Sequence, residues 1–118
     1  MEIILSKQCE SLTGSLGKGF GYFIQRRRKH DGSVRFFSQR SKHQPIPADG
    51  HLRFIFACAE LAQAKLHIVD IKVNAQEVYD ALYEAGHFIA ARRVLKYLQP
   101  TALMSPNEII NLKITFGL

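Results

Sequence analysis

Residues 49–66 constrain the fold most, because their apolar side chains cover more than one side of a helix. The residues that recur at spacings of three and four are Leu52, Ile55, Ala59, Ala62 and Leu66. The stripe is widened by Phe54, Phe56, Cys58 and Leu61. A surface helix carries a single apolar face, so this pattern predicts a helix at the centre of the core, with Asp49 as its N-cap.

Strand patterns precede this helix. A short apolar strand is expected at residues 2–6, and two segments rich in aromatic and branched residues follow at 19–28 and 33–40. Asp31 and Gly32 lie between them, and Asp-Gly is typical of a two-residue type I′ turn. This predicts a basic hairpin at about residues 19–41, with Arg28 opposite Arg35.

A strand and a second helix are expected after the central helix. Residues 67–73 alternate like a strand, and Asn74 can then cap a helix that has Glu77 at its third position. Its apolar pattern runs to about Leu98, with Gly86 interpreted as a packing glycine in a bent helix. A helix-turn-helix fits less well, because it would place Arg92 at a position that normally holds a buried aliphatic residue.

The C-terminal segment begins with helix-start chemistry at Ser105 and Pro106. We expect only a short helical turn there, because residues 110–116 alternate between apolar and polar side chains as in a strand. The predicted fold class is therefore α+β, a mainly antiparallel sheet in the order β-β-β-α-β-α-β with helices packed on one face. Residues 1–118 are expected to form a single domain.

The charges are distributed unevenly along the chain. Residues 18–53 contain nine Lys and Arg against Asp31 and Asp49, a net charge of +7, whereas the whole chain of 118 residues has a net charge of +6. A local cluster of positive charge attracts polyanions, although four consecutive charges at a strand end are also typical of a solvated tip. The predicted nucleic-acid-binding residues are Tyr22, Arg26, Arg27, Arg28, Lys29, Arg35, Phe37, Arg40 and Lys42.

Other classes of protein find little support. Cys9 and Cys58 have no CxxC spacing and are expected to be free thiols, the histidines show no metal-ligand spacing, and the glycines at 14–21 match no phosphate-binding loop. Glu77, Asp80 and Glu84 share one helix face, which favours a solvated surface over a catalytic pair. We therefore expect no enzyme activity, no cofactor, no metal and no small-molecule substrate.

No apolar run approaches the roughly 20 residues that cross a bilayer, and the apolar stretch at the N-terminus is too short for a signal peptide. The expectation is a cytoplasmic protein with no membrane partner. Its predicted function is that of a small non-enzymatic module that binds DNA or RNA. The alternative is a protein-interaction or assembly function, with self-association included, through a strand edge at 110–116 or the apolar helix at 52–61.

Overall fold

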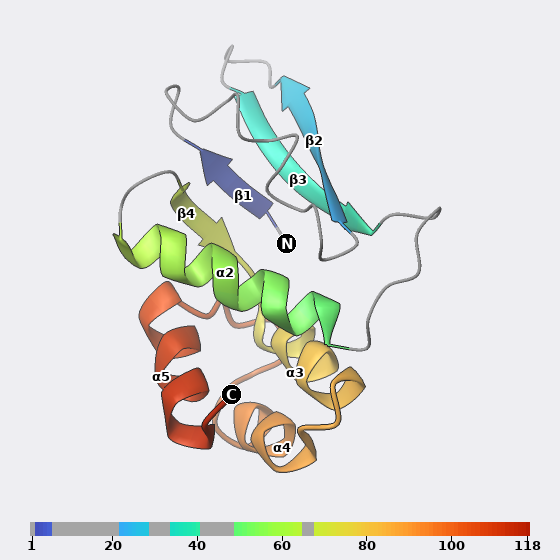
Figure 1. Ribbon diagram of the computed structural model, residues 1–118, viewed down its shortest axis with the longest axis vertical. Coiled ribbons are helices and arrows are strands. Elements are labelled where there is room, and N and C mark those ends of the chain that lie inside the picture. Colours follow the sequence, from blue (N-terminus) through green and yellow to red (C-terminus); the bar gives the residue numbers. More distant parts are fainter. Residues whose placement is uncertain (1, 6–21, 29–33, 41–48, 65–67) are drawn as a thin grey trace.

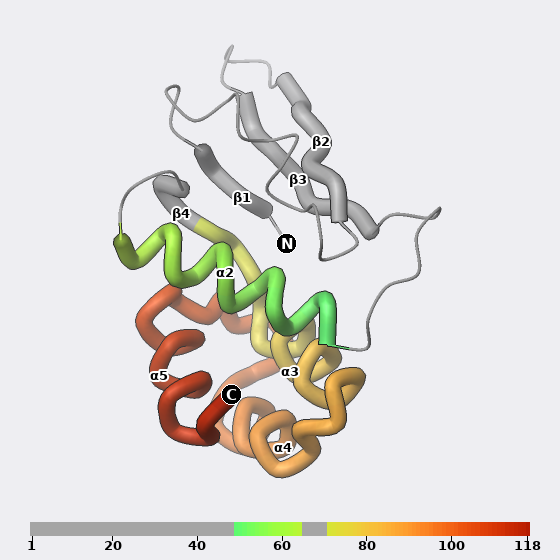
Figure 2. Tube along the Cα trace, in the orientation of Figure 1, coloured from blue at the N-terminus to red at the C-terminus, as the bar shows by residue number. Residues whose placement is uncertain are grey.

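The computed structural model describes residues 2–5, 22–28, 34–40, 49–64 and 68–118, and the side chains of residues 49–64 and 71–118. Four helices make up most of residues 49–64 and 71–118 (Figure 1). They are Gly50–Ala64 (α2), Ala75–Glu84 (α3), Phe88–Tyr97 (α4) and Pro106–Phe116 (α5). The backbone trace runs along α2, then through α3 and α4, and ends in α5, which begins beside α2 (Figure 2).

Helix α2 is the centre of the core, as the sequence predicts. Leu52 is 3% exposed, Ile55 is fully buried, and Phe54 and Phe56 on the other sides of the helix are buried as well. Helices α3 and α5 and the strand Ile68–Lys72 (β4) all contact α2. Its broad apolar stripe is explained by these neighbours on several sides.

Four strands are described by their backbone. Besides β4, they are Glu2–Leu5 (β1), Tyr22–Arg28 (β2) and Val34–Arg40 (β3), and they pair in the order β2-β3-β1-β4 with antiparallel neighbours. The predicted register of β2 and β3 is wrong by one residue. Arg28 lies opposite Val34 rather than Arg35. The predicted turn at Asp31-Gly32 lies outside the described residues.

The predicted fold class, an α+β fold with a mainly antiparallel sheet, is wrong. Across residues 49–64 and 71–118, where side chains are described, the chain is mostly helical and contains only the end of one short strand, β4, so the sheet is not the main part of this region. Two segments account for the error. Residues 75–97 form two helices rather than one, and residues 110–116 belong to α5 rather than to a last strand.

Gly86 separates α3 from α4 because it adopts a left-handed conformation with φ +86°. The Gly86 and His87 amides donate to the Tyr83 and Leu82 carbonyls at 3.0 and 2.9 Å, which is the hydrogen-bond pattern of a Schellman cap. A Cβ at Gly86 would have nothing within 4 Å. The predicted role as a packing glycine in a bent helix is therefore wrong, and the glycine is required by its backbone angle.

Helix α5 continues well beyond the predicted short turn. Ser105 Oγ accepts from the Glu108 amide at 3.2 Å, and Glu108 Oε1 accepts from the Ser105 amide at 3.1 Å, a complete capping box. Gly117 closes the other end at φ 65°. With both ends fixed, Ile109 and Phe116 turn toward the core at helical spacing, while Ile114 is left exposed.

Candidate functional site

Seven of the nine residues predicted from the basic segment lie in two strands. Strand β2 contains Tyr22 and Arg26–Arg28, and β3 contains Arg35, Phe37 and Arg40. Lys29 and Lys42 lie outside the described residues. The side chains of all nine are outside the described part as well, so their use as a binding site stays a prediction.

Within the described side chains, the exposed face of α4 is the most cationic surface of a single helix. Arg92, Arg93 and Lys96 are all exposed on it, and the helix contains no acidic residue. Its opposite face buries Ala90, Ala91 and Val94. Because these buried positions fix how the helix rotates, the three cations all lie on its exposed side.

An exposed tyrosine lies among these cations. Tyr97 is 68% exposed, and the Arg93 guanidinium carbon and the Lys96 Nζ lie 5.6 and 5.5 Å from the centre of its ring. The Arg93 guanidinium also lies 5.9 Å from the ring centre of Phe116 on α5. Both distances are within the range of cation–π attraction, so Arg93 is held between two aromatic rings from two helices.

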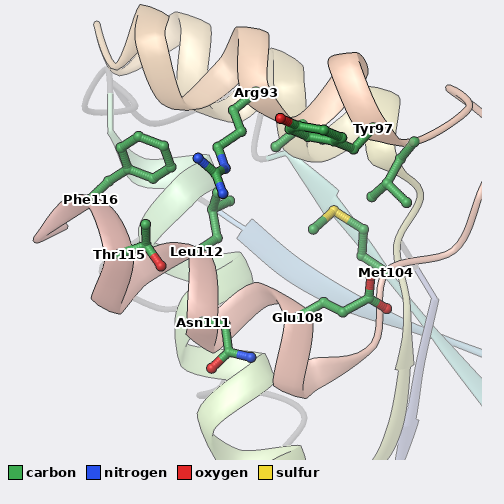
Figure 3. A pocket seen from close by; sticks show the side chains of 10 residues that line it. Arg93, Tyr97, Met104, Glu108, Asn111, Leu112, Thr115 and Phe116 are labelled. Atoms are coloured by element: carbon green, nitrogen blue, oxygen red, sulfur yellow. The ribbon is translucent and has the colours of Figure 1, made fainter.

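A pocket of about 290 Å³ lies between α4 and α5 (Figure 3). In this view Arg93 extends from α4 toward α5, between Tyr97 and Phe116, and Met104 lies beneath the tyrosine. We call this hollow the α4–α5 pocket. The residues that line it are Arg93, Val94, Tyr97, Leu98, Met104, Glu108, Asn111, Leu112, Thr115 and Phe116.

The two walls of the α4–α5 pocket differ in charge. The α4 wall contributes Arg93, and the α5 wall contributes the carboxylate of Glu108 together with the polar side chains of Asn111 and Thr115. The capping hydrogen bond from the Ser105 amide fixes one Glu108 oxygen. The pocket therefore combines apolar, cationic and hydrogen-bonding groups in one small volume.

A second polar pair joins the first turns of α2 and α3. His51 Nε2 lies 3.4 Å from Glu77 Oε1, and both side chains are largely shielded from solvent. Burial acts to raise the pKa of Glu77, but the neighbouring His51 side chain acts to lower it, and the pKa lies below its ordinary value. The expected solvated acidic face is thus wrong for Glu77, although Asp80 and Glu84 are exposed.

Reactive and metal-binding groups are scarce in the part of the chain whose side chains are described. Cys58 is a free thiol, as predicted, and burial raises its pKa to about 12, which leaves it protonated and unreactive. Cys9 lies outside the described residues. Among the residues that the structure describes, no group of three His, Cys, Asp or Glu residues is placed to hold a metal ion. No helix in this part of the chain is both long and apolar enough to cross a membrane.

The two surfaces that the sequence predicts for a protein-interaction function are not exposed in the structure as expected. Residues 110–116 are helical, so they offer no strand edge, and the apolar residues of 52–61 are mostly buried in the core. Exposed apolar side chains lie elsewhere, and Tyr83, Phe88 and Ile89 are grouped around the end of α3 and the start of α4. The Tyr83 and Phe88 rings meet edge to face at 4.8 Å.

Comparison of the chain with family models, curated proteins and solved structures found no match. The cationic face of α4 was not predicted as a binding site, because residues 54–118 have equal numbers of basic and acidic residues. A charge count over 65 residues conceals the local excess of positive charge on one helix that has three cations and no carboxylate. Counting charges by helix face would have found it.

Proposed function

We propose that this chain is a small, non-enzymatic nucleic-acid-binding module that uses the exposed face of α4 to contact phosphates. The observation that carries this proposal is the grouping of Arg92, Arg93 and Lys96 on one face of a helix with no acidic residue. Phosphate contacts of this kind provide most of the affinity of nonspecific nucleic-acid binding.

The aromatic ring among the cations favours a nucleic acid over a simple solubilising role. Proteins that bind single strands combine cations, which follow the backbone, with aromatic rings, on which bases stack. Tyr97 provides such a ring beside Arg93 and Lys96. A surface that only keeps a protein in solution has no need for an exposed aromatic side chain between its charges.

The sequence adds a second basic region that supports the same function. Residues 18–53 have a net charge of +7. The predicted phosphate contacts in this region, in addition to those on α4, remain Arg26, Arg27, Arg28, Lys29, Arg35, Arg40 and Lys42. Phosphates are common to DNA and RNA, so the test includes both.

The test is a salt-dependent binding titration of the full chain with single-stranded and duplex DNA and RNA. The double variant Arg92→Gln, Lys96→Gln should reduce the salt slope by roughly one unit for each cation that no longer neutralises a phosphate. The free energy of unfolding should change by less than about 1 kcal/mol, because exposed charges contribute little to folding.

The matched control is the double variant Arg53→Gln, Lys113→Gln, which removes the same charge from α2 and α5. Arg53 pairs with Asp49 and Lys113 with Glu60, away from the α4 face. Its salt slope should stay close to that of the wild type. Equal reductions of the slope in the two double variants would assign the effect to net charge and contradict the role of α4. Absence of all binding at low salt would favour a protein partner at Tyr83, Phe88 and Ile89.

A further inference from the structure

We propose that the α4–α5 pocket receives one unpaired base of a single-stranded nucleic acid while the adjoining phosphates lie along α4. This inference rests on the proposed function and names the ligand of that same surface. It is carried by three properties of the pocket, namely its aromatic walls, its separated charges and its size.

The aromatic walls suit a flat ring. Arg93 is already held between Tyr97 and Phe116, at 5.6 and 5.9 Å from their centres. A planar guanidinium stacks on bases as well as on aromatic side chains. Tyr97 is 68% exposed, so its ring remains accessible to a base that enters from solvent. Stacking on Tyr97 and Arg93 therefore needs little rearrangement of the protein.

The separated charges orient the strand. Arg92, Arg93 and Lys96 attract phosphates to the α4 side, whereas the Glu108 carboxylate on α5 repels them. The same carboxylate can accept hydrogen bonds from the amino groups on a base edge, and Asn111 is a second polar group on that helix. The backbone is thus expected along α4, with the base edge directed toward α5.

The size of the α4–α5 pocket is suited to one base and is too small for a base pair of a duplex. A volume of about 290 Å³ lies at the lower end for pockets that hold small ligands, so it suits a single ring system better than a larger group. A base inside a duplex is stacked and paired, and it must be extruded from the duplex before it can enter a pocket, which weakens binding. Single strands therefore bind here more tightly than duplexes of the same sequence.

The experiment compares a single-stranded oligonucleotide with an abasic strand that has the same number of phosphates. The wild-type chain should bind the strand with bases roughly tenfold more tightly, because stacking on one aromatic side chain contributes about that much. Tyr97→Leu should remove this preference and keep the salt slope. The control Tyr83→Leu removes a tyrosine that is also exposed but lies outside the pocket, and it should keep the preference.

A spectroscopic measurement reports the base directly. The chain contains no tryptophan, so a 2-aminopurine placed in the strand can be excited without interference from the protein. Its fluorescence should be quenched on binding to the wild type and to Tyr83→Leu, and much less on binding to Tyr97→Leu. This readout does not depend on affinity, provided that each protein is added to saturation.

The outcomes separate the two proposals. Salt-dependent binding with equal affinity for the abasic strand would overturn the base-binding pocket and leave the nucleic-acid function standing. Loss of the preference in both tyrosine variants would also overturn the pocket. Absence of binding to any strand would overturn both proposals together.

Discussion

Gly86 shows how a single residue sets the course of the chain, because its left-handed backbone turns α3 into α4. We predict that Gly86→Ala lowers the free energy of unfolding by about 1 kcal/mol, the strain of an L-residue at positive φ. Gly86→Asn should cost less, because Asn tolerates this conformation better. Urea unfolding of both variants measures the difference. Equal destabilisation by the two substitutions would indicate that side-chain packing, rather than the backbone angle, decides the effect.

The Glu77 carboxylate makes part of the stability depend on pH. The pKa of Glu77 is lower in the folded chain than its ordinary value, so its charged form stabilises the fold. This contribution is present above the unfolded pKa of about 4.3 and is lost as the pH falls through the folded pKa. Glu77→Gln should therefore lose less stability than the wild type between about pH 5 and pH 3.

Urea unfolding at a series of pH values tests this expectation. His51→Ala removes the neighbouring side chain that lowers the pKa of Glu77, so its pH dependence should also be weaker than that of the wild type. Parallel curves for the wild type and Glu77→Gln would show that this carboxylate has no part in the acid sensitivity.

Among the elements, α5 depends most visibly on its ends. Ser105→Ala removes the side-chain acceptor of the capping box and should reduce the free energy of unfolding by about 1 kcal/mol. Ser105→Asp replaces it with another good capping group and should restore most of the stability. Thermal unfolding of the three proteins makes the comparison. If Asp and Ala are equally destabilising, the hydroxyl acts through something other than the cap.

The same helix shows which elements a sequence can predict. Local chemistry was sufficient for the starts of α3 and α5, since Asn74 and Ser105 cap them as predicted. The alternating pattern of residues 110–116 was misleading, because alternate positions and helical positions overlap in so short a segment. What decides between them is the contact of α5 with α2, and residue spacing carries no information about it.

At the scale of the whole molecule, the core was more predictable than the surface. The breadth of the apolar stripe in residues 49–66 was enough to place α2 at the centre. The α4–α5 pocket was not predictable, because Arg93 and Phe116 are 23 residues apart and meet only after two helices pack. The charge along the sequence indicated a basic segment but gave no indication of the α4 face.

The attachment of α4 has a consequence for how the molecule moves. Among the described elements α4 packs mainly on α3, and the pocket separates part of it from α5. Non-helical backbone flanks it at Gly86 and Leu98. Because fewer neighbouring elements hold α4 than hold α2, its amide hydrogens should exchange with deuterium faster than those of α2. A bound strand should slow exchange in α4 more than anywhere else, and uniform exchange across the helices would show instead that the molecule opens only as a whole.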